Sequence, residues 1–172
     1  MDVKSRVRVI AGAGLAIAII GGTAGITLAR DDDHTLYRAD VMAGVTAPYT
    51  GTGNAIRGIT GGAAPWVIAH SDIEVRTSGS VDVEVEGLVI GPTGPAQFAG
   101  KNPVLNQKVI VSCLSTDAAG AATTVNASSE TFPVDAAGNG EGRVHVDLPS
   151  PCYAPIVFVA SAGGNWFAVS GA

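Results

Sequence analysis

The sequence has little charge and few aromatic residues for its length. Charged residues make up 15% of the 172 residues and aromatic residues 5%, whereas hydrophobic residues reach 47%. This composition excludes a disordered polyelectrolyte. Basic residues are scarce, because 10 Lys and Arg stand against 15 Asp and Glu, and no Lys/Arg cluster occurs beyond the N-terminus. With a net charge of -5, the chain is not expected to bind nucleic acid.

A helical pattern is also missing after residue 29, where Gly and Pro interrupt the chain frequently. Strand patterns take its place. Residues 81–86 (VDVEVE) alternate apolar and acidic side chains and residues 143–148 (RVHVDL) repeat the alternation, which is typical of half-buried antiparallel strands. Denser apolar runs at 108–114 and 156–160 indicate central strands that are buried on both sides. Four shorter runs complete a set of seven to eight strands: 66–69, 73–76, 123–126 and 166–169.

Gly- and Pro-rich turns separate these strands. Many short strands with turn signals between them predict an all-β fold, and we expect an antiparallel, immunoglobulin-like (Ig-like) β-sandwich over residues 45–172. Residues 30–44, which open with three aspartates, are predicted to form a polar spacer. The Gly- and Thr-rich residues 44–65 are expected to be a surface loop or an edge strand laid over the sandwich.

The N-terminus has the three-part pattern of a secretory signal. Lys4, Arg6 and Arg8 precede the uncharged stretch 9–29, which ends in a small-x-small cleavage site at residues 27–29, with Arg30 as the first mature residue. The competing interpretation is a retained membrane anchor, because a helix over residues 9–29 would span a bilayer's ~30 Å core. In either case the protein is predicted to be secreted or extracellular, with membrane contact only through residues 9–29 if they are not cleaved.

The two cysteines, Cys113 and Cys152, both lie in the exported part of the chain. Two cysteines in an oxidising compartment most simply form one disulfide. We expect it to link the strand that carries Cys113 to the start of the next-to-last strand. Closing this loop would stabilise the fold by roughly 3–4 kcal/mol in the chain-entropy model.

Motifs for catalysis are missing from the sequence. No serine lies in a G-x-S-x-G elbow, no His/Cys spacing fits zinc, and residues 51–58 depart from the dinucleotide-binding glycine pattern. His70 with Asp72, and His145 with Asp147, are the pairs on which an unrecognised hydrolase site could be built. We expect no catalytic residue, no metal site and no cofactor.

Two sets of side chains could instead form a binding surface. Asp82, Glu84 and Glu86 share one strand face, either as a solvated face or as a binding surface, since carboxylates ~7 Å apart along a strand do not converge on one Ca²⁺ ion. Trp66 and Trp166 each follow a glycine pair and start an apolar strand. They are either core residues or an exposed pair that grips a sugar or a protein surface.

Three runs of sequence carry a resemblance: 45–58 (VTAPYTGTGNAIRG), 65–68 (PWVI) and 149–159 (PSPCYAPIVFV). They resemble small exported proteins of high-GC bacteria, a likeness that covers most of residues 45–171. The resemblance implies an exported location and brings no known activity with it.

We therefore predict an exported, non-enzymatic β-sandwich that serves as a structural or binding module at the bacterial cell surface. Its partner would be an unidentified protein or glycan of the cell envelope. A secreted hydrolase and a carbohydrate-binding module that uses Trp66 or Trp166 are the alternatives. Burial discriminates among them, because an enzyme needs a converging polar cluster in a pocket and a sugar platform needs exposed tryptophans.

Overall fold

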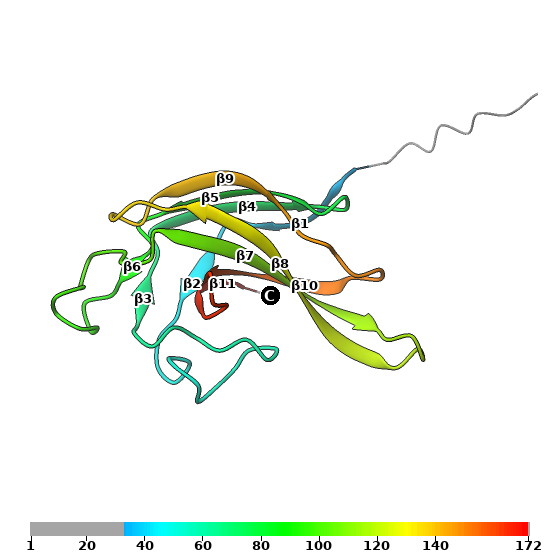
Figure 1. The fold of residues 1–172 in the computed structure, drawn as a ribbon, viewed down its shortest axis with the longest axis horizontal. Coiled ribbons are helices and arrows are strands. Elements are labelled where there is room, and N and C mark those ends of the chain that lie inside the picture. The colour runs from blue at the N-terminus through cyan, green and yellow to red at the C-terminus, as the bar shows by residue number, and fades with distance from the viewer. Residues whose placement is uncertain (1–32, 172) are drawn as a thin grey trace, which may run out of the picture. The chain divides into compact units, whose positions relative to one another are not determined.

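The computed structural model describes residues 33–171, and every regular element among them is a β-strand (Figure 1). The predicted signal or anchor at residues 1–29 lies outside the described residues. Over residues 33–171 there is no helix with the length and apolar character needed to cross a membrane.

The strands form two main sheets and one short ribbon, and all paired strands are antiparallel. The four-stranded sheet has the order β1 (Thr35–Ala39), β4 (His70–Arg76), β5 (Ser80–Glu86), β9 (Gly140–His145). The five-stranded sheet has the order β2 (Met42–Gly44), β11 (Trp166–Ser170), β10 (Tyr153–Ser161), β7 (Asn106–Thr116), β8 (Ala122–Pro133). The ribbon pairs β3 (Trp66–Val67) with β6 (Val89–Ile90).

The two main sheets lie face to face, one above the other in Figure 1, and share one hydrophobic core. Val81, Val83 and Val85 of β5 are buried in it, together with Val109 and Val111 of β7. These side chains alternate with outward-facing residues because successive residues of a strand point to opposite faces of the sheet. The predicted all-β, antiparallel architecture is confirmed.

The dense apolar strands lie inside the five-stranded sheet, as predicted, but burial on both sides fails at Leu114, the last residue of the predicted run 108–114, which is 44% exposed. β10 and β7 are neighbours, and residues 156–160 of β10 are all buried. One face of this sheet meets the core, and the chain segment 45–65 lies over the other (Figure 1). The ring of Tyr49, from this segment, lies 6.4 Å from the ring of Trp166, which in turn lies 6.0 Å from Phe158 of β10.

A β-bulge lies in β8 at the edge of the five-stranded sheet. The β7 partner of Thr131 is Lys108 and that of Ser128 is Ile110, so β8 contains one extra residue between these pairs. Ser129 lies in the bulge, and its Oγ accepts the backbone N–H of Val109 at 3.0 Å. A bulge bends its strand and increases its twist. Beyond it, β8 runs beside β9 of the other sheet.

The predicted spacer at residues 30–44 is wrong in its C-terminal part. Residues 35–39 and 42–44 form β1 and β2, which are edge strands of the two sheets. Ala39 and Met42 point into the core, whereas the acidic run that suggested a spacer ends at Asp33. Strands of three to five residues carry too little alternation to stand out in the sequence.

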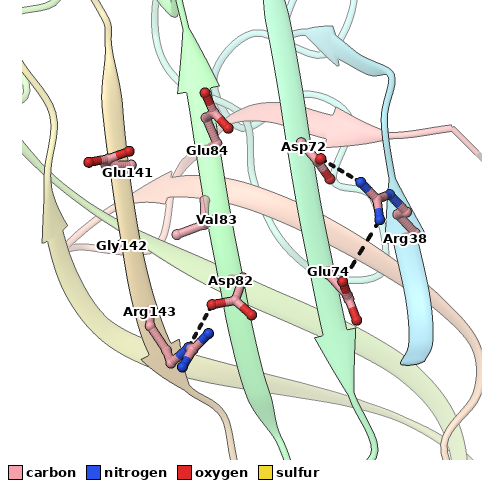
Figure 2. Close-up of a pocket in the computed structure, with 9 residues that line it drawn as sticks. All are labelled: Arg38, Asp72, Glu74, Asp82, Val83, Glu84, Glu141, Gly142 and Arg143. Atoms are coloured by element: carbon pink, nitrogen blue, oxygen red, sulfur yellow. Dashed lines mark hydrogen bonds and ion pairs between the residues drawn. The ribbon is translucent and has the colours of Figure 1, made fainter. Parts of the chain in front are cut away.

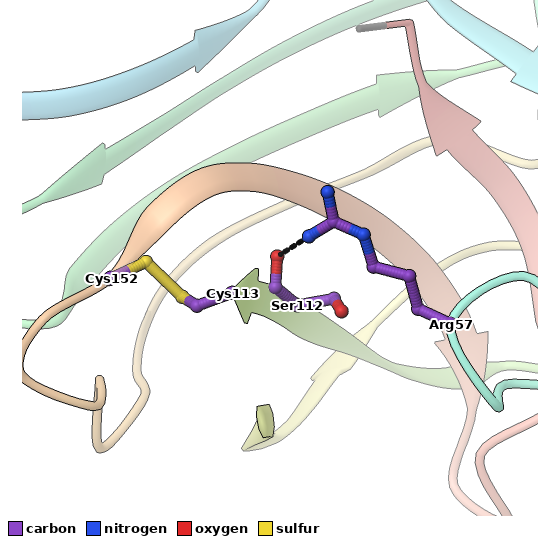
Figure 3. Close-up of a disulfide and its surroundings, with 4 residues drawn as sticks. All are labelled: Arg57, Ser112, Cys113 and Cys152. Atoms are coloured by element: carbon purple, nitrogen blue, oxygen red, sulfur yellow. Dashed lines mark hydrogen bonds between the residues drawn. A yellow bond between two sulfur atoms is a disulfide. The ribbon is translucent and has the colours of Figure 1, made fainter. Parts of the chain in front are cut away.

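The disulfide links Cys113 of β7 to Cys152, the residue before β10, and so confirms the predicted pairing and its place in the chain (Figure 3). β7 and β10 are neighbours in one sheet. In the immunoglobulin fold the disulfide joins the two sheets, whose strand orders are ABED and CFG. Both the strand order and the position of the disulfide in this protein differ from that pattern.

Candidate binding surface

The outer face of the four-stranded sheet carries a row of balanced charges across its four strands. Arg38 is paired with Glu74, Glu74 with Asp82, and Asp82 with Arg143. The Nε of Arg143 donates to Oδ1 of Asp82 at 2.6 Å, and Nη2 of Arg76 lies 3.1 Å from Oε1 of Glu74. The hydrogen bond from Arg143 lowers the pKa of Asp82 below its usual value. Each carboxylate in this row therefore has a cation beside it.

The next row across the sheet consists of carboxylates. Asp72 is paired with Glu84, and Glu84 is paired with Glu141, so the three side chains stand directly opposite one another; we call them the acidic row. Arg38 binds Asp72, with 2.5 Å between Nη2 and Oδ2. Among the described residues, Glu84 and Glu141 form no ion pair. Like charges directly opposite on neighbouring strands repel.

An open hollow of about 510 Å³ lies over both rows. Figure 2 shows Glu141, Glu84 and Asp72 side by side on three strands, with the Arg143–Asp82 and Arg38–Glu74 contacts beside them. The strands hold every charged group of the hollow through backbone pairing, so the spacing of the carboxylates is fixed by the sheet. This arrangement can attract a cationic group.

The acidic and apolar side chains of β5 lie on opposite faces of the sheet, as the alternation in residues 81–86 predicts. Glu84 and Glu86 are exposed and Asp82 is half-buried, whereas Val81, Val83 and Val85 are buried. The three acids are not equivalent, however. Asp82 is held by Arg143, and Glu86 is paired with His70 across the strands, so Glu84 is the one that belongs to the acidic row.

Both tryptophans are core residues, so the alternative prediction of an exposed pair that grips a sugar or a protein surface is wrong. Trp66 is 3% and Trp166 is 2% exposed. The ring of Trp66 stacks on Phe167 with 4.1 Å between centroids, while Trp166 packs between Tyr49 and Phe158. A sugar platform needs an accessible aromatic face, and neither tryptophan offers one.

The two His/Asp pairs differ in their geometry. Nε2 of His145 lies 3.5 Å from Oδ1 of Asp147, but His145 is 58% exposed and Asp147 is fully exposed, so this pair stands in solvent. His70 is exposed as well, and Asp72 binds Arg38 instead. A hydrolase site would need such groups to converge with a nucleophile in a pocket. In the described part of the chain, no serine hydroxyl is hydrogen-bonded to either pair, although Ser80 stands opposite His145 across the strands.

The Asp- and Asn-rich turn at residues 135–141 uses its oxygens to hold the backbone. Oδ1 of Asp135 accepts the backbone N–H groups of Ala137 and Asn139, and Oδ1 of Asn139 accepts the N–H of Gly87. The backbone hydrogen bonds that Asp135 accepts, first from Asn139 and then from Ala137, lower the pKa of its carboxyl. Over residues 33–171, no group of three or more His, Cys, Asp or Glu is arranged to hold a metal ion.

Sequence reasoning found Glu84 but missed Glu141 and Asp72 as its neighbours. The alternation in residues 70–76 (HSDIEVR) signals that Asp72 and Glu74 share a face, but it does not say which strand lies beside them. Searches against protein-family models, curated proteins and solved structures find no match for this chain.

Proposed function

We propose that this protein is an exported, non-enzymatic binding module whose acidic row binds a cationic group of a cell-envelope partner. The observation that carries the proposal is the position of Glu84 directly opposite Glu141, with no cation of the described chain between them. A basic side chain or an amino group of a partner would relieve the repulsion between the two carboxylates. Complementary charge of this kind favours a specific partner and speeds association.

The scaffold suits such a role. A rigid sheet presents the row, and the neighbouring balanced row supplies arginines that fix Asp72 and Asp82 in place. A partner therefore meets preorganised carboxylates, which reduces the entropy lost on binding. The solvent-exposed His/Asp pairs give no comparable support to a hydrolase.

Export is part of the proposal. The N-terminal pattern of basic residues followed by residues 9–29 supports it, and the Cys113–Cys152 disulfide is compatible with an oxidising compartment. Intact-mass analysis of protein recovered from outside the cell tests it. A chain that begins at Arg30 is expected, and a mass that includes residues 1–29 would establish a retained anchor instead.

Binding is tested by comparing Glu141→Gln with Asp147→Asn. Both changes remove one negative charge from an exposed position on or just after β9, but only Glu141 belongs to the acidic row. We would measure retention of the chain on isolated cell envelope and on an immobilised lysine-rich peptide, at several salt concentrations. Glu141→Gln should weaken retention severalfold and reduce its salt dependence, while Asp147→Asn should not. Equal effects of the two changes would contradict a binding role for the row.

A further inference from the structure

Part of β8 is an unpaired sheet edge. β8 pairs with β7 on one side, and in the described part of the chain no strand pairs with its other side over residues 122–128. The bulge at Ser129 marks the end of this edge, because β8 then turns toward β9, where the backbone N–H of His145 donates to Oε1 of Glu130. In Figure 1 the hairpin formed by β7 and β8 projects from the body of the protein.

The other edges of the two sheets are protected. β2 has three residues, and β1 has five residues with an irregular register between Thr35 and Tyr37. β9 lies beside β8. Natural proteins blunt exposed edges with short strands, bulges, charged side chains or proline. Residues 122–128 contain none of these devices.

The edge is also free of charge. Residues 118–129 contain no acidic or basic side chain, in a chain whose net charge is -5. A second copy of an acidic protein is repelled at most surfaces, but it meets no like charge here. Thr123, Thr124 and Val125 are β-branched and favour strand pairing.

We propose that two copies of this protein pair through β8, antiparallel and about a two-fold axis at Val125, so that one continuous sheet runs through both. The register follows from the edge itself. The strand begins at Ala122 and the bulge follows Ser128, so Val125 is the midpoint of the free segment. Pairing about this point uses the whole edge and places Thr124 of one copy opposite Asn126 of the other.

A second copy would also approach a face that one chain leaves open. Leu114 is 44% and Tyr153 is 63% exposed, and the two are paired across β7 and β10. Leu114 is paired with Thr124, so all three side chains share one face. Two residues further along each strand, Ser112 and Asn126 are paired with each other and both are hydrogen-bonded to Arg57 of segment 45–65.

The two-fold axis brings the Arg57 turn of one copy toward Leu114 of the other. Asn126 of the second copy would stand next to Thr124, and two strand spacings, roughly 10 Å, would separate it from Leu114. The turn that carries Arg57 sits on Asn126, since Nδ2 of Asn126 donates to the backbone oxygen of Arg57 at 3.0 Å. Each copy would therefore place its Arg57 turn beside the exposed Leu114 of the other.

Sedimentation velocity tests the dimer, with the chain as it is recovered from the exporting cell, at about 10–200 µM. The wild type should sediment as a dimer. Thr124→Lys should shift it to a monomer, because Thr124 is exposed and the two lysines would be diagonal neighbours about 7–8 Å apart. Ala118→Lys is the control, since it adds the same charge at the hairpin tip, away from the paired edge, and should remain dimeric. A wild type that is monomeric at 200 µM, or a dimer that Thr124→Lys leaves intact, would overturn the proposal.

Hydrogen exchange gives a test that needs no variant. Amides within residues 122–128 should become more protected as the concentration of the wild type rises. A dimer whose formation leaves the exchange of these amides unchanged would be paired elsewhere, and the proposal would be wrong. This measurement decides the matter even if Thr124→Lys does not fold.

Discussion

Arg57 extends from its loop to the five-stranded sheet, where its Nη1 donates a hydrogen bond of 2.8 Å to the backbone oxygen of Ser112 (Figure 3). Arg57 has a φ of 48° and Gly58 a φ of 82°, which are the positive values that a type I′ turn requires at both central positions. Positive φ is costly for a residue with a Cβ atom. The contacts to the sheet therefore hold Arg57 in a conformation that favours glycine.

Two replacements of Arg57 separate the effect of its hydrogen bond to Ser112 from the cost of its positive φ. Arg57→Ala removes the hydrogen bond and keeps the unfavourable φ, so the free energy of unfolding should fall by about 1–2 kcal/mol. Arg57→Gly also removes the bond but avoids the cost of a positive φ, roughly 1–2 kcal/mol, which exceeds the entropic cost of glycine; it should therefore be the more stable of the two variants by roughly 0.5–1 kcal/mol. Urea unfolding measures both. An alanine variant as stable as the wild type would show that the contact with Ser112 contributes nothing.

Removing the disulfide should destabilise the fold more strongly. Cys113 is buried and its bond to Cys152 closes a loop of 39 residues, so the paired change Cys113→Ser with Cys152→Ser should cost about 2–4 kcal/mol. The midpoint of thermal unfolding should fall by several degrees. Labelling of thiols in unfolded, freshly exported protein gives the direct check. Two reactive thiols per chain would show that the bond does not form there.

Neighbouring residues of β5 should differ strongly in how far a new charge destabilises the fold. Val83 is buried in the core, so Val83→Asp should lower the free energy of unfolding by several kcal/mol. Glu84 is exposed in the acidic row, so Glu84→Lys should change it by less than ~0.5 kcal/mol. Chemical denaturation of both variants tests the contrast, and equal unfolding would contradict the register of β5.

Glu84→Lys also bears on function. Because it inverts a charge in the acidic row, a variant that folds normally should lose attachment to the cell envelope. A folded variant that attaches as well as the wild type would show that the row is only a solvated face.

The alternation in residues 81–86 was enough to predict which side chains of β5 are buried, because the period of a strand fixes the two faces. It could not predict the acidic row. Glu141 comes to lie opposite Glu84 through the pairing of β5 with β9, and nothing within either strand records that pairing. Register depends on the turns and on the whole core.

The sequence allowed a core position for Trp166 but could not decide between it and an exposed one, for a related reason. Its strand is apolar in either case, and the cover over its outer face comes from Tyr49, more than a hundred residues earlier in the chain. Gly61 allows this segment to pack tightly, because a Cβ at this position would lie 2.1 Å from the backbone oxygen of Tyr49. The sequence indicated a surface segment here, but not the face that it covers.

The turn between β8 and β9 should make stability depend on pH. Hydrogen bonds from the backbone of Asn139 and Ala137 lower the pKa of Asp135 in the folded protein. A carboxyl whose folded pKa lies below its unfolded value of about 3.9 favours the folded state above that value. Its contribution is lost as the pH falls through the folded pKa. The pKa of Asp82, beside Arg143, is lowered in the same direction, so its charge also favours the folded state above the unfolded pKa.

The variant Asp135→Asn tests this dependence. Asparagine keeps an acceptor oxygen for the turn but carries no charge, so the variant should be less stable than the wild type at pH 7. The difference should shrink as the pH falls below about 4, because the wild type then loses its charged hydrogen bonds as Asp135 is protonated. Urea unfolding between pH 7 and pH 2 measures the difference directly. A difference that stays constant over this range would mean that the charge on Asp135 does not stabilise the turn.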